Sequence, residues 1–358
     1  MKVDKTNSPD EVFMQRCLEL AGNGLGYVAP NPMVGAVVVH KGEVIGEGYH
    51  RQFGQAHAEV NAIQAVKDSS LLEESTLYVN LEPCVHTGKT PPCTDLILAK
   101  KIPSVVIGTP DPNPLVQGKG IEKLIKSGIQ VTTGIIEDAC RDLNKRFFTF
   151  HKLKRPYIIL KWAQTKDGFI DIKRKAGESI GVNWITSPLS RDLVHKWRSE
   201  EQGIMAGTHT VIMDNPHLNV RHWNGKNPVR IVLDRSLKIP KHFHVLDNKQ
   251  NTLIFNEKKS EKRGSTEFIK MDFSDRDLNP LFGELYKRNF LSVFIEGGRE
   301  LHEYLIENNL WDEARVFIGD KLFHDGIKAP EISYLPEFQK NILTDSLIIY
   351  KNPKSNNL

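Results

Sequence analysis

One histidine, two cysteines and one glutamate stand where they could build a metal centre. The segment HAEVNAI begins at His57 and contains Glu59, and it has the pattern of a helix start. The segment EPCVHTGKTPPC contains Cys84 and ends at Cys93. A catalytic zinc site uses three protein ligands and keeps one position for water. His57, Cys84 and Cys93 supply such a set, and Glu59 could take and return the proton of that water.

Other interpretations fit parts of this pattern. HAE on a helix can be ordinary surface sequence, and the two cysteines can be unrelated buried thiols. A structural zinc would take a fourth protein ligand, for which His86 is available. The combination favours a catalytic zinc, because prolines stiffen the turn and Cys93 precedes a helical pattern. The amino terminus of a helix favours a thiolate.

Composition predicts a folded protein of two domains. The chain has 358 residues, and single cores stop growing at roughly 250–300 residues. Apolar residues make up 39%, charged residues 26%, and the net charge is +4, which argues neither for nor against an anionic ligand. The polar start MKVDKTNSPDE lacks the apolar core of a signal peptide. No apolar run approaches the roughly 20 residues that span a bilayer. We expect a cytoplasmic protein without a membrane partner.

Helix and strand patterns alternate in the first half of the chain. Ser8-Pro9-Asp10-Glu11 is a capping-box pattern that predicts a helix start. MVGAVVVHKGEVIGEGYH predicts two strands joined by a turn at Lys41-Gly42. Helix patterns over residues 57–67, CTDLILAK and GKGIEKLIKSG alternate with the strand patterns TLYVNL, SVVIGT and GIQVTTG. This order predicts a three-layer α/β domain that closes near residue 148.

A second α/β pattern follows a basic connector, HKLKRP at residues 151–156. PYIILKWAQ, PVRIVLD, NTLIF and LSVFIEGG predict buried strands, and Ser187-Pro188 opens a helix. We therefore place the two domains at residues 1–150 and 151–358. The run EKKSEKRG at residues 257–264 is expected to be a solvated loop, because no aromatic side chains accompany its charge as in a nucleic-acid contact.

Several motifs resemble known families. HAE followed by PC and a second cysteine resembles the zinc-dependent nucleoside and nucleobase deaminases, in which the glutamate is a general acid and base. The turn between the cysteines is longer here than the two residues of that pattern. With NPMVGAVVV and DPNPLVQGKG, it resembles the bifunctional deaminase–reductases of riboflavin biosynthesis. LKWAQTKDG, WITS, GTHTVIMDNPHLNVR, VRIVLDR and FIEGG match the reductase half of that family. The resemblance implies a cytidine-deaminase-like α/β/α domain followed by a dihydrofolate-reductase-like α/β domain.

The resemblance also implies two reactions and two cofactors. Zn²⁺ would support the hydrolytic deamination of a diaminopyrimidinone ribosylamino phosphate, and NADPH would then reduce the ribosyl chain to ribityl. His57, Cys84 and Cys93 match the zinc ligands, and Glu59 matches the proton shuttle. Four residues match positions that contact the pyrimidine or its ribose phosphate: Asn31, His50, Ala58 and Lys89. Taken alone, Lys89 would be a solvated surface lysine.

The reductase half is implied to bind both its substrate and NADPH. The matching substrate positions are Lys161, Arg198, Leu218, Arg221 and Glu296. The matching cofactor positions are Ala163, Trp184, Thr210, Asp214, Gly297, Gly298 and Arg299. The planar guanidinium group of arginine suits the binding of a phosphate. A glycine pair before a helix lets backbone amides approach a phosphate. Without the resemblance, Lys161 could be a solvated strand-end lysine, and Thr210 and Asp214 could be helix-surface residues.

One segment departs from the family pattern, and rival functions stay open. DIKRKAGESIGVN is longer than the family's usual segment, so the substrate-binding serine before the tryptophan has no clear match. Ser179 is the nearest serine, and Val182 occupies the counted position. A nucleic-acid-editing zinc deaminase would need a basic, aromatic-lined channel, which the nearly neutral charge and the reductase-like half disfavour. A structural-zinc interaction module would not bind a nucleotide through its second half. A single-activity enzyme with one decayed domain is a further alternative. For either function, the sequence leaves association into a homo-oligomer open.

Overall fold

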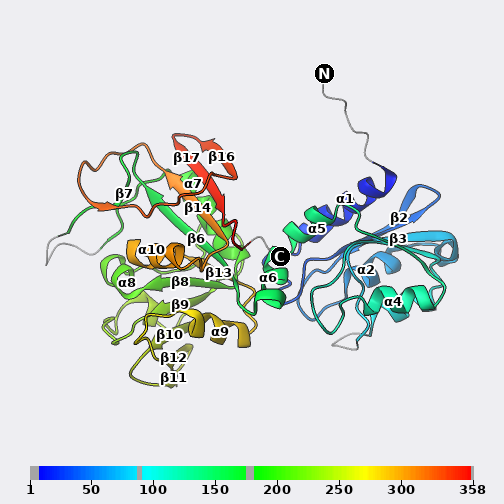
Figure 1. The fold of residues 1–358 in the computed structure, drawn as a ribbon, viewed down its shortest axis with the longest axis horizontal. Coiled ribbons are helices and arrows are strands. Elements are labelled where there is room, and N and C mark those ends of the chain that lie inside the picture. The colour runs from blue at the N-terminus through cyan, green and yellow to red at the C-terminus, as the bar shows by residue number, and fades with distance from the viewer. Residues whose placement is uncertain (1–7, 87–90, 175–180, 356–358) are drawn as a thin grey trace. The chain divides into compact units, whose positions relative to one another are not determined.

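The computed structural model describes residues 8–86, 91–174 and 181–355. The chain forms two compact units, Met1–Leu153 and Lys154–Leu358, which are described one at a time (Figure 1). Within the described part of the chain, no helix is both long enough and apolar enough to cross a membrane.

A five-stranded mixed sheet forms the centre of the first unit (Figure 1), with the strand order β2-β1-β3-β4-β5. Strand β1 pairs antiparallel with β2 and β3, whereas β3, β4 and β5 run parallel. The strands are β1 (Gly35–His40), β2 (Glu43–Tyr49), β3 (Ser75–Leu81), β4 (Ser104–Thr109) and β5 (Gln130–Thr133). Parallel neighbours need crossover connections, and helices supply them. The helices are α1 (Pro9–Gly22), α2 (Ala58–Ala65), η1 (Ser69–Glu74), α3 (Cys93–Ala99), α4 (Lys119–Lys126), α5 (Glu137–Leu143) and α6 (Lys145–Leu153).

Helices cover both faces of this sheet. Alternate residues of a strand point to opposite faces, so Val38 of β1 packs with α2, α3 and α4 while Val37 packs with α1 and α5. Ala62, Ile97 and Leu124 bring the first three helices into one core cluster. The other cluster contains residues of α1 and α5. The first unit is therefore the three-layer α/β/α domain that the sequence predicts.

Local signals in the first unit are mostly confirmed. The Ser8 hydroxyl accepts from the Glu11 amide at 3.3 Å, and the Glu11 carboxylate accepts from the Ser8 amide at 3.0 Å, which completes the capping box. Lys41 and Gly42 take φ values of 48° and 84° in the turn between β1 and β2, as a tight hairpin requires. The prediction of a connector from residue 151 is wrong in its first half, because α6 continues to Leu153. Three phenylalanines of this helix, Phe147, Phe148 and Phe150, are buried.

The second unit contains a ten-stranded sheet with the order β11-β12-β10-β9-β8-β13-β6-β14-β17-β16, and a small sheet of β15 and β7. The strands of its first half are β6 (Tyr157–Gln164), β7 (Phe169–Asp171), β8 (Gly203–Gly207), β9 (Val229–Leu233), β10 (Thr252–Asn256) and β11 (Glu261–Arg263). The later strands are β12 (Thr266–Lys270), β13 (Ser292–Ile295), β14 (Glu313–Ile318), β15 (Ile327–Lys328), β16 (Phe338–Ile342) and β17 (Asp345–Lys351). The helices are α7 (Pro188–Glu200), α8 (Thr208–Asp214), η2 (His244–Leu246), α9 (Asn279–Lys287) and α10 (Arg299–Glu307).

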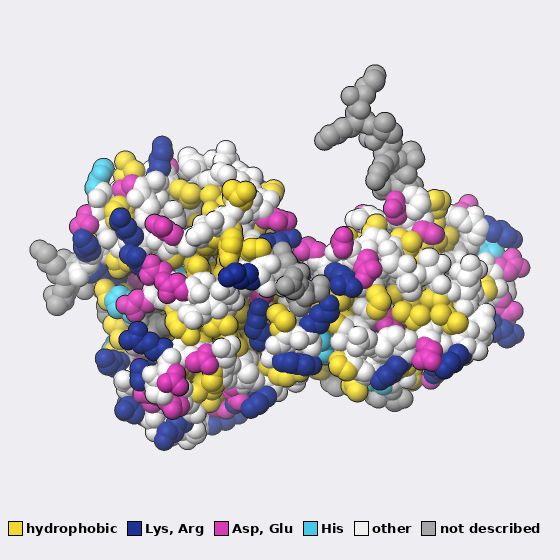
Figure 2. All heavy atoms as spheres, viewed as in Figure 1, with side chains coloured by type: hydrophobic (Ala, Val, Ile, Leu, Met, Phe, Trp, Pro, Cys, Tyr) yellow, Lys and Arg dark blue, Asp and Glu magenta, His cyan; other side chains and the backbone are white. Residues whose placement is uncertain are grey.

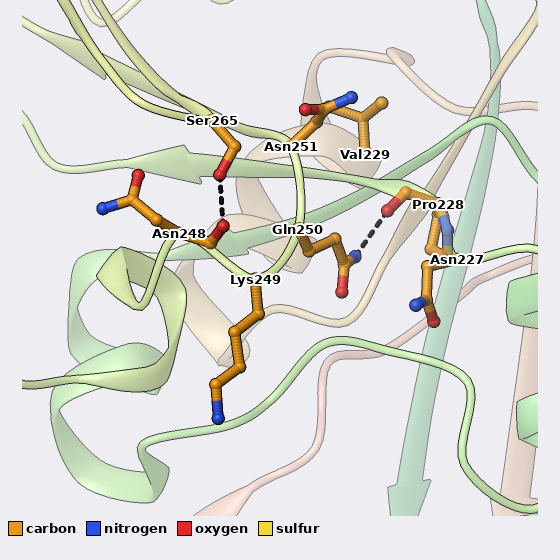
Figure 3. Close-up of a pocket in the computed structure, with 8 residues that line it drawn as sticks. All are labelled: Asn227, Pro228, Val229, Asn248, Lys249, Gln250, Asn251 and Ser265. Carbon is orange, nitrogen blue, oxygen red and sulfur yellow. Dashed lines mark hydrogen bonds between the residues drawn. The ribbon is translucent and has the colours of Figure 1, made fainter.

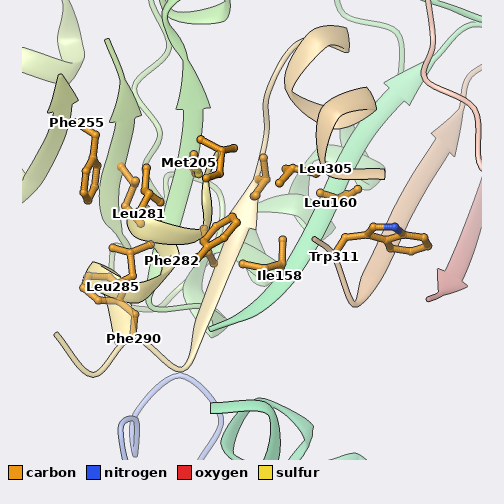
Figure 4. Close-up of a cluster of buried hydrophobic side chains, with 14 of the residues drawn as sticks. Ile158, Leu160, Met205, Phe255, Leu281, Phe282, Leu285, Phe290, Leu305 and Trp311 are labelled. Atoms are coloured by element: carbon orange, nitrogen blue, oxygen red, sulfur yellow. The ribbon is translucent and has the colours of Figure 1, made fainter. Parts of the chain in front are cut away.

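The large sheet is also covered on both faces. Figure 4 shows the core on one face, where Phe282 of α9 and Leu305 of α10 lie with Leu160 of β6. On the other face, Trp197 of α7 packs with Ile159 of the same strand. Helix α8 joins a further cluster through its buried Val211. The carboxyl ends of the central parallel strands, where functional side chains are expected in such sheets, therefore lie between covered faces.

The run EKKSEKRG is not wholly a loop. Its residues Glu261–Arg263 form β11, which pairs antiparallel with β12 at the edge of the sheet. Charged side chains on an edge strand discourage pairing with another chain, which explains why a polar run is tolerated there. On the faces in view in Figure 2, basic and acidic side chains are interspersed over each unit.

Candidate functional site

The three predicted zinc ligands converge in the first unit. His57 Nδ1 lies 3.3 Å from Cys93 Sγ and 3.6 Å from Cys84 Sγ. All three donor atoms lie within 4.8 Å of one another. Zinc bonds of about 2.0–2.3 Å place tetrahedral nitrogen and sulfur ligands about 3.3–3.8 Å apart. The donor set and its spacing therefore fit Zn²⁺.

Element ends position these ligands. His57 is the N-cap residue of α2, Cys93 is the first residue of α3, and Cys84 follows β3. The Cys93 amide donates to Cys84 Sγ at 3.3 Å. The Thr94 amide and hydroxyl both donate to the Cys84 carbonyl at 3.2 Å. The start of α3 thus holds the Cys84 turn and supplies an amide to its sulfur, which stabilises a thiolate.

The two cysteines of the cluster differ in the direction in which their pKa is shifted. A hydrogen bond from the Cys93 side chain, and then one from His57, lower the pKa of Cys84 to about 4 in spite of its burial. The hydrogen bond to Cys84 also raises the pKa of His57. The contact with Cys84, followed by burial, raises the pKa of Cys93. The Cys93 proton must leave when a metal binds, because thiolates are the ligands.

Glu59 is buried beside the cluster. It is 3% exposed, and its carboxylate hydrogen-bonds the Cys93 side chain. Burial, and then the charge of Cys84, raise the pKa of Glu59. His57 stands just outside α2 and Glu59 in its first turn, so two residues that would not share the face of a regular helix both reach the cluster. Among the described residues, no lysine or arginine side chain binds this carboxylate, and a buried charge without a partner is costly, which indicates a functional role.

The alternative fourth ligand does not join the cluster. His86 is exposed, and the metal-ligand group found among the described residues contains only His57, Cys84 and Cys93. Three ligands leave a coordination position for water, as a catalytic site requires.

Of the four residues expected to bind the pyrimidine, His50 and Ala58 lie next to His57, and Asn31 bonds His50. Asn31 Nδ2 lies 3.1 Å from His50 Nε2, and His50 Nδ1 lies 3.0 Å from the Ala56 carbonyl. His50 Nδ1 therefore donates, and its Nε2 accepts from Asn31. Burial lowers the pKa of His50, and its ring stands edge-on to His57 at 5.5 Å. Ala58 is the fully buried first residue of α2. Lys89 lies outside the described residues.

Sequence reasoning missed two buried asparagines that hold the NPMVG segment. Asn144 bonds both the amide and the carbonyl of Met33 at 2.8 Å. Asn80 donates to the Met33 carbonyl at 3.1 Å and accepts from the Gly35 amide at 2.8 Å. These bonds fix the segment that carries Asn31. Asn144 lies 111 positions from Met33, so no local pattern signals the contact.

Sequence reasoning also missed Glu82, which comes just before the Cys84 turn. Its carboxylate is 4% exposed and accepts four backbone amides. The donors are Asp111 at 3.1 Å, Gly118 at 2.9 Å, Gly120 at 2.9 Å and Ile121 at 3.2 Å. A Cβ at Gly120 would meet the Pro83 carbonyl at 2.3 Å, so only glycine fits this approach. The acidic residue in LEPC and the glycines of GKG were the available signals.

In the second unit, Arg198 and Glu296 form the centre of the predicted substrate site. Arg198 Nε and Nη2 bind the two Glu296 carboxylate oxygens at 2.6 and 2.7 Å. Burial opposes the ionisation of Glu296, but Arg198 and then Lys161 lower its pKa to about 2. Burial lowers the pKa of Lys161, and the charge of Glu296 offsets part of this effect. Lys161 is therefore not a solvated strand-end lysine.

Two further predicted substrate residues lie near this pair. Arg221 interacts electrostatically with Arg198 and Glu296, and its amide donates to His195 Nδ1 at 3.2 Å. Burial, then Arg198, lowers the pKa of His195 to about 4. His195 was missed, although it stands three positions before Arg198 on α7, a spacing that shares a helix face. Leu218 is 2% exposed, and its carbonyl accepts from Gln250 at 3.0 Å.

Part of the predicted cofactor set is brought together. A Cβ at Gly298 would lie 3.0 Å from Thr210 Oγ1, and one at Gly297 would lie 2.8 Å from a Leu301 methyl carbon. The start of α10 therefore approaches α8 closely at Gly298, whereas the space beside Gly297 is taken by Leu301 of α10 itself. Asp214 ends α8 and lies 3.3 Å from Arg174. Burial raises the pKa of Asp214 to about 6, although the charge of Arg174 opposes this.

The other predicted cofactor residues make separate contacts. Trp184 is 47% exposed, with the Arg191 guanidinium 4.5 Å above its ring. Ala163 lies in β6 opposite Phe317 of β14. Arg299 binds Glu303 at 2.6 Å.

The described ends of the lengthened segment pack against the end of α8. Arg174 donates to the Met213 carbonyl at 2.8 Å, and the Gly181 amide donates to the same carbonyl at 3.1 Å. Val182 is 45% exposed, and Ser179 lies outside the described residues. The segment thus reaches the helix that carries Thr210.

A cavity of about 310 Å³ in the second unit is lined by none of the predicted site residues (Figure 3). It is lined by Asn227, Pro228, Val229, Asn248, Lys249, Gln250, Asn251 and Ser265. Among the described residues that line this cavity, Gln250 alone hydrogen-bonds a predicted site residue: it donates to the Leu218 carbonyl.

Comparisons with known proteins define the class of the chain. Residues 7–109 match the cytidine and deoxycytidylate deaminase zinc-binding region. Residues 156–343 match the RibD C-terminal domain. The chain thus joins a zinc-binding deaminase region to a reductase domain, and the predicted pair of α/β folds is confirmed.

Full-length relatives define the family. The riboflavin biosynthesis protein RibD of Aquifex aeolicus is 40% identical over 331 residues, which cover 90% of each chain. RibD of Escherichia coli is 34% identical over 349 residues and 92% of each chain. The crystal structure of a deaminase/reductase from Thermotoga maritima superposes with a TM-score of 0.85 at 38% identity, over 96% of this chain and 98% of that one. The chain belongs to the RibD family of bifunctional deaminase–reductases of riboflavin biosynthesis, which use Zn²⁺ and NADPH.

Proposed function

We propose that each activity belongs to one unit. Residues 1–150 deaminate a diaminopyrimidinone ribosylamino phosphate by hydrolysis, and residues 151–358 reduce the ribosyl chain of the product with NADPH. The Thermotoga maritima relative, described as a diaminohydroxyphosphoribosylaminopyrimidine deaminase and 5-amino-6-(5-phosphoribosylamino)uracil reductase, supports this substrate class. The observation that carries the proposal is the convergence of three metal donors beside a buried carboxylate.

Glu59 is the proton carrier of the first reaction. His57, Cys84 and Cys93 would hold Zn²⁺, whose charge acidifies water bound to it. The buried Glu59 takes a proton from the attacking water and gives it to the departing amine, so that ammonia leaves. Its raised pKa suits this task, because a carrier works best with a pKa near the working pH.

Asn31 and His50 orient the pyrimidine. The hydrogen bond between them and the bond from His50 to the Ala56 carbonyl hold two polar side chains at fixed positions next to His57. Asn31 keeps its carbonyl oxygen for a ring or ribose donor. Ala58 offers a small apolar contact, and Lys89 supplies a positive charge to the ring or the phosphate.

The second reaction uses a cationic pocket and a glycine turn. Lys161, Arg198 and Arg221 surround Glu296, and this set, with Leu218, binds the ribosyl phosphate of the deaminated product. Guanidinium groups suit phosphate because they are planar and always charged.

NADPH binds along α8 and the start of α10. Gly297, Gly298 and Arg299 present backbone amides and a positive charge to a cofactor phosphate. Glycine at position 298 keeps space open between this turn and Thr210, because a Cβ at that position would lie 3.0 Å from Thr210 Oγ1. Asp214, Trp184 and Ala163 complete the cofactor contacts.

The proposal also limits the partners. The substrate is a small molecule, with no nucleic acid or membrane partner, and the enzyme works in the cytoplasm; homo-oligomerisation stays open. The interspersed charges on the faces in Figure 2 support this, because nucleic-acid sites are basic patches.

The test is a pair of assays on the purified full-length protein. With the diaminopyrimidinone ribosylamino phosphate as substrate, ammonia should appear first. NADPH should then be oxidised in an equal amount, and the product should carry a ribityl chain. Ammonia release without NADPH oxidation would contradict the second activity. Neither activity with this substrate, alongside deamination of an oligonucleotide, would favour the nucleic-acid deaminase.

A further inference from the structure

A second group of metal-ligand side chains lies in the second unit. His217 follows α8, His244 begins η2, and Asp247 follows η2. One donor atom from each of the three lies within 4.8 Å of the other two. The two imidazole rings are stacked, with centroids 3.6 Å apart and an interplanar angle of 23°. None of these residues belongs to the zinc cluster or to the residues expected to bind substrate or NADPH.

One buried arginine ties the three residues together. Arg230 of β9 is 1% exposed. Its Nε donates to the His217 carbonyl at 2.9 Å, and its Nη1 donates to the His244 carbonyl at 2.8 Å and to Asp247 Oδ1 at 2.9 Å. The His244 amide donates to Asn215 Oδ1 at 2.9 Å. Three separate loop positions are thus fixed by a single guanidinium, which preorganises the side chains they carry.

The donor atoms are available. Within the described part of the chain, the ring nitrogens of His217 and His244 take part in no hydrogen bond. Asp247 Oδ1 accepts from Arg230 and from the Lys249 amide at 2.9 Å, which leaves Oδ2 for another partner. Both histidines are half-buried, and none of their ring nitrogens is among the buried polar atoms that lack a partner. The two stacked rings and the second oxygen of Asp247 are therefore accessible to an ion.

We propose that His217, His244 and Asp247 form a second metal site, which takes a divalent transition ion such as Zn²⁺. Two imidazoles and one carboxylate are a common donor set for such ions. Bonds of about 2.0–2.1 Å place donors about 3.4 Å apart, a separation that falls within the 4.8 Å limit inside which the three donor atoms lie. Arg230 then acts as the outer partner of the ligating carboxylate, in the way that hydrogen-bonded carboxylates support metals.

The charge of Arg230 sets this site apart from the zinc cluster. The guanidinium offsets the Asp247 charge, whereas no lysine or arginine of the described residues hydrogen-bonds a cysteine sulfur at the first site. The second ion therefore binds more weakly than the first and exchanges more readily. His217 directly precedes Leu218, a proposed substrate contact, so the ion is placed to stiffen one wall of the reductase site.

The test counts ions on the full-length protein dialysed against micromolar free Zn²⁺. The natural protein should hold two equivalents, and Cys84→Ser should hold one. His244→Ala and Asp247→Asn should each hold one, because they lose only the second ion. His242→Ala is the matched control: His242 is exposed and stands two positions before His244, and its loss should leave two equivalents.

Co²⁺ identifies which ion is lost. The thiolate cluster gives a near-ultraviolet sulfur-to-metal absorption, whereas a nitrogen and oxygen site gives only weak visible bands. His244→Ala should keep the sulfur band and lose the second set, and Cys84→Ser should do the reverse. Asp247→Asn keeps the volume and an oxygen for Arg230, so it tests the site even if His244→Ala does not fold. One equivalent of Zn²⁺ in the natural protein, or two equivalents in both His244→Ala and Asp247→Asn, would overturn the proposal. The result does not depend on either enzymatic activity.

Discussion

The two sites of this chain are built in opposite ways. The zinc cluster takes its ligands from 36 positions of sequence, between His57 and Cys93, and all three stand at the ends of secondary-structure elements. The residues proposed for the reductase site stretch from Lys161 to Arg299, and several of them come from β6, α7, α8 and the start of α10. The first site is fixed by local turns and the second by tertiary contacts such as the Arg198–Glu296 pair. A compact motif therefore defines the first, and only the fold assembles the second.

The largest expected effect separates proton transfer from metal binding in the compact site. Glu59→Gln should reduce ammonia release by about 10²–10⁴-fold, the usual contribution of a general acid and base. The metal should stay, because Glu59 is not a ligand, and this is checked by metal analysis alongside the ammonia assay. Glu73→Gln changes an exposed glutamate and should have no effect. Loss of the metal in Glu59→Gln would refute the assignment.

The next effect tests the dispersed site. Arg198→Ala leaves Glu296 buried without its partner, and breaking a buried ion pair costs about 3–5 kcal/mol. The free energy of unfolding of the second unit should fall by about that amount in urea titration, and NADPH oxidation should fall with it. Ammonia release should be unchanged. Arg263→Ala, which removes a solvent-exposed pair, should leave both quantities as they are.

The same pair predicts a pH dependence. Arg198 and Lys161 hold the pKa of Glu296 at about 2, below its ordinary value of 4.5. A carboxyl with a lowered pKa stabilises the fold fully above its unfolded pKa, and this contribution is lost as pH falls. The stability difference between the natural protein and Glu296→Gln should therefore be constant above pH 4.5 and shrink toward pH 2. A difference that grows on acidification would show that Glu296 is not held as an anion.

A smaller effect concerns the backbone that supports the zinc turn. Glu82→Gln replaces an acceptor-only carboxylate by an amide whose NH₂ group would face backbone donors. Losing charged hydrogen bonds of this kind costs about 2–3 kcal/mol. The first unit should lose that much in urea unfolding, and the KM for deamination should rise more than kcat falls. An unchanged KM would mean that Glu82 supports the fold alone.

The smallest effect tests a purely local signal. Ser8→Ala removes one half of the capping box of α1 and should cost about 1 kcal/mol. Ser8→Thr keeps a hydroxyl and should cost less. Neither change should alter ammonia release, because α1 covers the sheet and carries none of the proposed site residues. A loss of ammonia release equal to that in Glu59→Gln would contradict this separation.

Local chemistry was predictable from the sequence, and long-range contacts were not. The capping box at Ser8, the turn at Lys41-Gly42 and the positions of His57 and Cys93 at helix starts follow from neighbours along the chain. The end of α6 was missed, because the helix, which contains buried phenylalanines, continues into a basic segment whose composition is typical of a linker. Strand β11 was missed for a related reason, since its pairing with β12 outweighs its polar composition.

The site residues show the same division. His57, Cys84 and Cys93 could be found by spacing alone. Asn144 could not, because its bonds to Met33 cross 111 positions. Glu82 is an acidic residue before a proline, a pattern that predicts a solvated turn. In the fold, its carboxylate is instead buried and accepts four backbone amides. Arg198 and Glu296 could be assigned to the site only through the family resemblance. No sequence pattern between α7 and β13 indicates that these two side chains are in contact.

One measurement tests the central claim that the two activities occupy separate sites. Both assays are run on two full-length variants, Glu59→Gln and Asp214→Ala. Glu59→Gln should release almost no ammonia from the first substrate, yet oxidise NADPH at the natural rate when it is given the deaminated product. Asp214→Ala should do the reverse. If both activities fall together in both variants, the division into two independent sites is wrong.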